Sequence, residues 1–258
     1  MAALAPHRTV YVVCDSAYAG RVILEKRPPN VHVISRLRMD AALYAPPPPV
    51  TPGRRGRRRR RGKRLPKPAR SAACCKKWLA RRINIYGSEV ETWITTRTAL
   101  WYIALRDAPV KIVIVRDPNG HRTDEAFFST DTAMEATAIL ETFAKRWSLE
   151  VTFHDAKQLL GFEDPQNQTP KAVRRTAPMA FLAYDLVLLW YAQRLIDGRA
   201  IPWLVRPWYR RKERPSFADM LAVLRRASWR VYVSDPSRGT RRRRKSLAPW
   251  IEAVISTA

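Results

Sequence analysis

Hydrophobic and polar positions near the start of the chain change from a strand-like pattern to a helix-like one and back again. The apolar run TVYVVCD predicts a short buried strand over 9–15, and VHVISRL predicts a second strand over 31–37. The segment between them has helical spacing until Pro28 and Pro29, which cannot continue a helix. This order of elements predicts a parallel βαβ unit, in which both strands run in the same direction.

Residues 82–130 carry a pattern rich in β-strands. Apolar or alternating runs such as VETWITTR and KIVIVRD are separated by turn sequences that contain proline, aspartate or asparagine. The pattern then becomes helical over about 132–160, with Asp131 as the predicted N-cap. A second apolar helix is predicted over 177–196, and Ser216 is predicted to cap a third helix, FADMLAVLRRA.

The apolar segment 177–196 is about as long as a membrane-spanning helix. Asp185 lies at its centre, however, and Arg194 lies near its end. Charges at these positions favour a buried helix of a soluble domain, so we expect no membrane partner.

Charge sets residues 45–81 apart from the rest of the chain. The proline-rich run APPPPVTPG does not suit a helix or a sheet, and residues 53–70 carry eleven cations and no acid. This composition predicts a flexible or extended arm, and the chain's net charge of +26 predicts a polyanionic partner, most often nucleic acid. The alternative is a solvated linker that binds any polyanion. The arm residues that we expect to contact DNA are Arg57, Arg58, Arg59, Arg60 and Arg61.

The three cysteines, Cys14, Cys74 and Cys75, show neither a C-x-x-C pair nor a histidine at zinc spacing. Adjacent cysteines rarely bridge each other, so the set predicts a reducing compartment. The chain also lacks a signal-peptide pattern at its start, and we therefore expect a cytoplasmic protein.

The segment FAKRWSLEVTFHDAK places Phe143, Arg146, Glu150 and Lys157 at steps of three, four and seven residues. On one continuous helix these steps keep the four side chains on one face. A carboxylate between two cations, beside an aromatic ring, suits a site that handles a metal-bound phosphate. The alternative is an ordinary Glu–Arg surface pair, which contributes only tenths of a kcal/mol.

Asp15 and Glu150 are the candidate catalytic and metal-binding residues. Asp15 follows a predicted parallel strand at its carboxyl end, where α/β sheets place ligands, although it could instead cap the helix that follows. We expect the two carboxylates to meet around a pair of Mg²⁺ or Mn²⁺ ions about 4 Å apart, which would support phosphodiester cleavage. Oxygens more than about 10 Å apart could not share such a pair. His154 is a weaker metal candidate, because it has no second histidine or cysteine partner.

Trp93 and Trp101, with the neighbouring Tyr102, lie in the β-rich region. Aromatic residues in such strands commonly belong to the core or to a sheet face. The alternative is that one of them stacks on an unpaired or flipped base of DNA.

Several of these segments together resemble the DDE-type cut-and-paste transposases of insertion sequences. Their Y-x2-R-x3-E-x6-K signature reads here as Phe143, Arg146, Glu150 and Lys157, with phenylalanine in place of tyrosine. Three further segments are also similar to this family: FFSTD before the signature, AVRRTAP after it and VYVVCDSAYAG near the start of the chain. The resemblance extends over about residues 4–230.

The resemblance implies an α/β fold: an incomplete RNase H-like core with a β-rich insertion and C-terminal helices. Asp15 would be the second metal-binding carboxylate and Glu150 the third, while Arg146 and Lys157 would contact phosphates at the DNA end. Phe143 would keep the ring of the family tyrosine without its hydroxyl. The expected parts are a partial core (1–44), the arm (45–81), the insertion (82–130), the catalytic and packing helices (131–197), and a basic helical region with a tail (198–258).

None of the fourteen residues before Asp15 is acidic, whereas the family carries its first aspartate on an upstream strand. The resemblance therefore implies a truncated, C-terminal part of a transposase with an incomplete active site. Its expected role is DNA transposition by metal-dependent strand cleavage and transfer. The alternatives are a catalytically inactive DNA-binding remnant and an unrelated RNA-binding protein. Expected partners are transposon ends and either a second copy or the full-length enzyme, beside the bacterial nucleoid.

Overall fold

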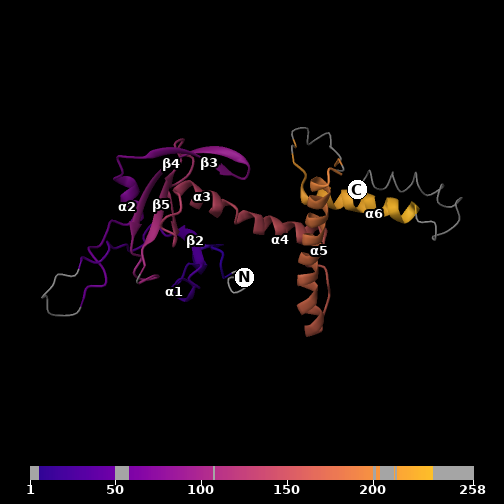
Figure 1. Ribbon diagram of the computed structural model, residues 1–258, viewed down its shortest axis with the longest axis horizontal. Coiled ribbons are helices and arrows are strands. Elements are labelled where there is room, and N and C mark those ends of the chain that lie inside the picture. The colour runs from indigo at the N-terminus through magenta and orange to yellow at the C-terminus, as the bar shows by residue number, and fades with distance from the viewer. Residues whose placement is uncertain are drawn as a thin grey trace. The chain divides into compact units, whose positions relative to one another are not determined.

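The computed structural model describes residues 6–49, 58–106, 108–199, 202–203, 212 and 214–234. The chain divides into two compact units, Met1–Trp147 and Ser148–Ala258. All strands among the described residues belong to the first unit, and the elements described in the second unit are helices (Figure 1).

The described part of the first unit holds a mixed sheet of six strands in the order β1-β2-β6-β5-β4-β3. The strands are β1 (Val10–Cys14), β2 (Val31–Leu37), β3 (Leu79–Ile85), β4 (Ser88–Ala99), β5 (Val110–Arg116) and β6 (Glu125–Ser129). Only β1 and β2 are parallel, and every other neighbouring pair is antiparallel. The strands expected in a separate insertion thus continue the sheet that β1 and β2 begin.

The predicted βαβ unit is confirmed. β1 and β2 pair in parallel from Val10 opposite Val31 to Cys14 opposite Ser35. They are joined by a short 3₁₀ turn, η2 (Ser16–Tyr18), and by the helix α1 (Arg21–Lys26), which ends just before the proline pair.

The prediction that β1 is buried is wrong. Tyr11 and Val12 keep 40% and 39% of their surface exposed. Within the described residues β1 pairs only with β2, so it is an edge strand. A strand with a neighbouring strand on one edge only is less well buried, so some of its apolar side chains stay exposed. Its other edge presents unpaired backbone N–H and C=O groups.

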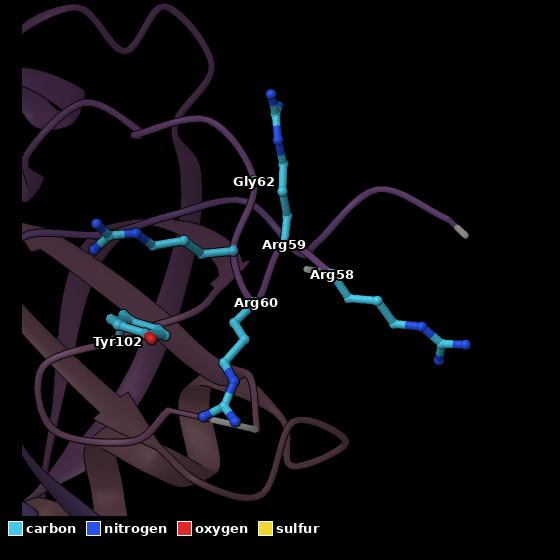
Figure 2. A pocket seen from close by; sticks show the side chains of 6 residues that line it. Arg58, Arg59, Arg60, Gly62 and Tyr102 are labelled. Atoms are coloured by element: carbon cyan, nitrogen blue, oxygen red, sulfur yellow. The ribbon is translucent and has the colours of Figure 1, made fainter. Parts of the chain in front are cut away.

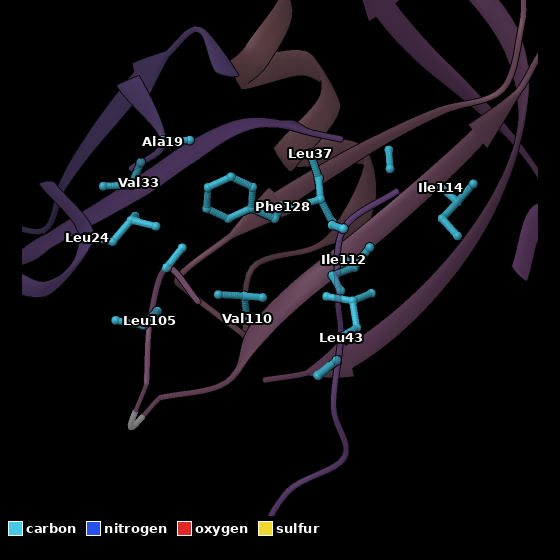
Figure 3. Packing of buried hydrophobic residues seen from close by; sticks show 14 of the residues in the cluster. Ala19, Leu24, Val33, Leu37, Leu43, Leu105, Val110, Ile112, Ile114 and Phe128 are labelled. Atoms are coloured by element: carbon cyan, nitrogen blue, oxygen red, sulfur yellow. The ribbon is translucent and has the colours of Figure 1, made fainter. Parts of the chain in front are cut away.

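Two apolar clusters cover the two faces of the sheet. Neighbouring residues along a strand point to opposite faces, so Val33 belongs to one cluster and Ile34 to the other. Leu24 of α1 and Phe128 of β6 fill the first cluster (Figure 3). The second cluster is closed by α3 (Ala136–Ala144), which packs across β1, β2, β3 and β6.

The described residues of the arm, 45–49 and 58–81, include a backbone bridge and a helix. Tyr44 forms antiparallel bridges with both Arg64 and Leu100. The helix α2 (Pro68–Ala73) follows, and its Pro68 and Ala72 side chains are buried. Apolar groups spaced between the cations thus pack on the sheet unit, and the flexibility of the arm stays a prediction.

The single helix predicted over about 132–160 is also corrected. The structure has α3 up to Ala144 and a separate helix α4 (Trp147–Leu159). At the break, the N–H of Arg146 donates to the carbonyl of Phe143 at 3.0 Å, three residues back rather than four. Glu135, and not Asp131, occupies the N-cap position of α3.

The second unit packs α5 (Pro170–Ile196) against α6 (Phe217–Ser234). The ring of Tyr184 stacks on that of Phe217 with centroids 4.2 Å apart. Ser216 precedes α6 as predicted, and its N–H donates to Asp219 at 2.7 Å.

The helix α5 is longer than predicted and less buried. Its most apolar stretch has a mean hydropathy of 1.3 and is 22% buried, so length and composition alone would allow it to cross a membrane. The expectation of a buried helix is therefore wrong for most of α5 within the described part. Leu182, Leu186 and Leu189 are exposed there.

Asp131 ties the end of β6 to the edge strand. The Tyr11 hydroxyl donates to Asp131 Oδ2 at 2.7 Å, and the N–H of Ala133 donates to Asp131 Oδ1 at 3.0 Å. The bond between the side chains raises the pKa of Tyr11 and lowers the pKa of Asp131. Its contribution to stability is fully present above the unfolded pKa of aspartate, about 3.9, and is lost as pH falls through the lower folded pKa.

We predict that Tyr11→Phe lowers the free energy of unfolding at pH 7 by about 0.5 kcal/mol, because the bond is exposed to water. Urea unfolding at pH 7 and at a pH below the folded pKa of Asp131 measures this, and the difference from the native chain should vanish at the lower pH. Tyr18→Phe, which removes the hydroxyl of an exposed ring, is the matched control. Equal losses in both variants would contradict the prediction.

Candidate functional site

Asp15 lies where the sequence predicted it, directly after β1 at the carboxyl end of a parallel strand. Its Oδ1 accepts hydrogen bonds from the backbone N–H of Ser16 at 2.5 Å and from the Ser16 hydroxyl at 3.2 Å. The alternative role of Asp15 as a cap is therefore confirmed for the 3₁₀ turn η2, and the carboxylate remains exposed. Burial raises the pKa of the neighbouring Cys14 thiol, so this sulfur stays protonated at neutral pH and is a poor metal ligand.

The four signature residues do not lie on one continuous helix. Phe143 belongs to α3, Arg146 lies in the break, and Glu150 and Lys157 belong to α4. The unbroken helix on which the prediction of a single stripe depended is therefore wrong, and a shared face of the four side chains stays a prediction.

Phe143 faces the sheet. Its ring lies 4.8 Å from that of Phe127, within the second apolar cluster. The guanidinium of Arg146 lies 5.7 Å from the Phe143 ring centroid, on the same unit. The structure therefore gives Phe143 a packing role, and its contact with DNA stays a prediction.

On the second unit, Glu150 is exposed in the first turn of α4, where the helix dipole favours a negative charge. Lys157 forms an ion pair with Glu163, so it has to exchange that partner before it can bind a phosphate. His154 approaches Asp155 at 3.3 Å.

The candidate metal ligands, Asp15 and Glu150, have the chemistry that a divalent ion prefers, but they are only two side chains. Carboxylate oxygens such as those of Asp15 and Glu150 are the ligands that Mg²⁺ prefers. Among the described residues, no group of three or more histidine, cysteine or acidic side chains lies close enough to hold a metal. Asp15 and Glu150 belong to different units, and their meeting around a metal stays a prediction.

A cationic pocket lies in the described part of the arm. Its volume is about 500 Å³, and it is lined by Arg58–Arg61, Gly62 and Tyr102. The side chains of Arg58, Arg59 and Arg60 extend in different directions from the loop (Figure 2). We call this set the arginine pocket. Arg57 lies outside the described residues.

Arg61 differs from its neighbours because two aromatic rings hold it. Its guanidinium carbon lies 4.3 Å from the ring centroid of Tyr44 and 4.7 Å from that of Tyr102. A Cβ atom at Gly62 would collide with the carbonyl oxygen of Pro46, so only glycine fits beside this stack. The role of Tyr44 was not predicted from the sequence. The available signal was an aromatic residue just before a proline run that leads into arginines.

The two tryptophans have different surroundings. Trp101 packs edge-to-face on Phe128 at 5.2 Å, at the border of the first apolar cluster, so its predicted core role is confirmed. Trp93 on β4 is 36% exposed. Base stacking by Trp93 stays a prediction.

A sequence model of the transposase DDE domain matches residues 1–186, more than two thirds of the chain. The chain belongs to the DDE transposase family. No curated protein matches it. Membership connects this transposase domain with DNA transposition and with DNA binding, and the family generally uses divalent metal ions. The matched residues include the arginine pocket and both candidate carboxylates.

We predict that replacing Arg58, Arg59 and Arg60 of the transposase domain together by glutamine weakens DNA binding and flattens its salt dependence. Each phosphate that the variant no longer neutralises should reduce the slope of log K against log salt by about 0.9. Fluorescence anisotropy with a duplex between low and moderate salt measures this slope.

The matched control replaces Arg21, Arg36 and Arg38, which removes the same charge. These three guanidinium groups are paired with Glu25, Glu125 and Asp40. The control should leave the slope nearly unchanged, and an equal change in both triple variants would show that only net charge matters.

Proposed function

We propose that this chain contributes Asp15 and Glu150 to a metal-dependent site for DNA strand cleavage and strand transfer. The main support is the family match, which includes both carboxylates. A second support is the position of Asp15, exposed at the carboxyl end of a parallel strand, where bound ligands are commonly found in α/β folds. A pair of bound Mg²⁺ or Mn²⁺ ions would activate water and stabilise the leaving oxygen.

The remaining residues of the proposed site handle the DNA. Arg146 and Lys157 carry the cations of the signature, and they would orient the phosphate under attack by charge-assisted hydrogen bonds. The arginine pocket would hold the backbone of the same DNA away from the reacting bond. Phe143 has no hydroxyl to donate to DNA, and we assign it to positioning Arg146 through the contact between ring and guanidinium.

We assign two carboxylates of the proposed metal site, Asp15 and Glu150, to this chain. The outer edge of β1, unpaired within the described residues, offers a place where a further strand could add. A second copy or a full-length transposase, acting beside the bacterial nucleoid, is the partner that we propose for this edge.

The second candidate function is DNA binding without cleavage. It is favoured by the absence, among the described residues, of a group of three metal-binding side chains. It is also favoured by the arginine pocket, which does not include either carboxylate. In this role the protein would occupy transposon ends and compete with an active transposase.

We predict that any cleavage of DNA carrying transposon ends requires Mg²⁺ or Mn²⁺, and that chelation stops it. Glu150→Gln should reduce cleavage by about a hundredfold or more, because it removes a metal ligand. Asp15→Asn should do the same while still capping the turn, since asparagine is as good a cap as aspartate.

Gel assays of nicking and strand transfer, run beside a DNA-binding titration, separate the two functions. Glu89→Gln changes an exposed carboxylate on β4 and serves as the control. Unchanged cleavage in Glu150→Gln would refute its assignment as a metal ligand. DNA binding without cleavage under either metal would establish the second function.

A further inference from the structure

A second cleft lies in the first unit, between α2 and the part of β4 that extends past β3. The pairing of β3 with β4 stops at Leu79 opposite Ile94, so Thr95, Thr96 and Arg97 of β4 lie beyond it. The space beside them is closed by α2 and by the two cysteines that follow α2, Cys74 and Cys75. We call this space, of about 250 Å³, the Arg97 cleft.

The Arg97 cleft is positively charged and has no compensating acid. Arg70 and Arg97 both line it, and none of its lining residues is acidic. The Nη1 atom of Arg97 is shielded from water, and no hydrogen-bond acceptor reaches it within the part of the chain that the structure describes. A guanidinium group with a shielded donor and no carboxylate partner is unfavourable unless another anion approaches it.

Arg116, in the same unit, shows an arginine whose positive charge and N–H donors have partners within the protein. Arg116 binds Asp124 through two hydrogen bonds of 2.8 and 2.6 Å and donates to the carbonyl of Ala72 at 3.2 Å. Its guanidinium carbon also lies 4.4 Å from the ring centroid of Trp78. Arg116 therefore has a structural role, whereas Arg97 forms no ion pair with an acid among the described residues.

We propose that the Arg97 cleft binds a phosphate group, held by the guanidinium groups of Arg70 and Arg97. Guanidinium donors match the oxygens of phosphate in geometry and charge. Thr95 lines the same space and adds an uncharged hydroxyl donor, whereas the Ser71 hydroxyl donates to the carbonyl of Pro66 at 3.4 Å. The volume is slightly below the range of about 300–1,000 Å³ that is usual for small-molecule sites, so the ligand is a single phosphate group with little attached to it.

The phosphate could come from a free phosphate ion or monoester, or from the backbone of DNA. Both sources present the same oxygens to the two arginines. The Arg97 cleft shares no lining residue with the arginine pocket and includes neither Asp15 nor Glu150. Phosphate binding in the Arg97 cleft can therefore be tested independently of the proposed cleavage activity.

The two cysteines of the cleft provide a direct readout of occupancy. We expect inorganic phosphate to slow the alkylation of Cys74 and Cys75 by a maleimide. Cys14 on β1 is the internal reference for the phosphate series alone, because it adjoins Asp15 of the proposed DNA site. The whole chain is labelled and then digested, and fragment-ion mass spectrometry of the peptides gives the three rates separately. A parallel series with a short duplex DNA in place of phosphate distinguishes the two sources.

Arg97→Gln should weaken the protection by about tenfold or more in phosphate concentration, since a charge-assisted hydrogen bond is removed. Arg70→Gln should also weaken it, and because Arg70 is exposed this variant tests the proposal even if Arg97→Gln does not fold. Arg81→Gln, an exposed arginine of β3 outside the cleft, is the matched control and should behave like the native chain.

Protection by phosphate that is abolished in the Arg70 and Arg97 variants supports a site for free phosphate or a monoester. Protection by DNA alone, abolished in the same variants, supports a site for the DNA backbone. Equal labelling rates with and without both ligands would overturn the proposal, as would protection that persists in Arg97→Gln and Arg70→Gln.

Discussion

Burial on both faces of one sheet is the constraint on which the first unit depends. Neighbouring apolar residues such as Val33 and Ile34 in β2, or Phe127 and Phe128 in β6, point to opposite sides of the sheet and require cover on each. The helix α1 and the segment before the arm cover one side, and α3 covers the other. This packing holds the end of β1, and with it Asp15, at the rim of the sheet. It also turns Phe143 inward.

The parts predicted well from the sequence are those whose signals are local. The limits of β2, the parallel pairing with β1 and the start of α6 after Ser216 follow from apolar runs, prolines and caps within a few residues. The break between α3 and α4 had no such signal, because neither glycine nor proline occurs between Ala136 and Leu160. The exposure of β1 depends on which strands lie beside it, and its own apolar pattern does not contain that information.

The arginines of the first unit include some that form ion pairs and others that line spaces without an acidic residue. Arg21, Arg36, Arg38 and Arg116 form ion pairs with acids of the same unit. Those of the arginine pocket and the Arg97 cleft line spaces without an acidic residue. Composition alone predicted a polyanionic partner correctly at the level of the family, but only the structure shows which cations have no acid beside them.

The stack of Arg61 between Tyr44 and Tyr102 fixes the position of one guanidinium group on the first unit. A disordered basic tail loses conformational entropy when it binds, and this loss offsets part of its attraction to phosphates. For a phosphate at this guanidinium the two rings would already have ordered the side chain, so that part of the loss would belong to folding.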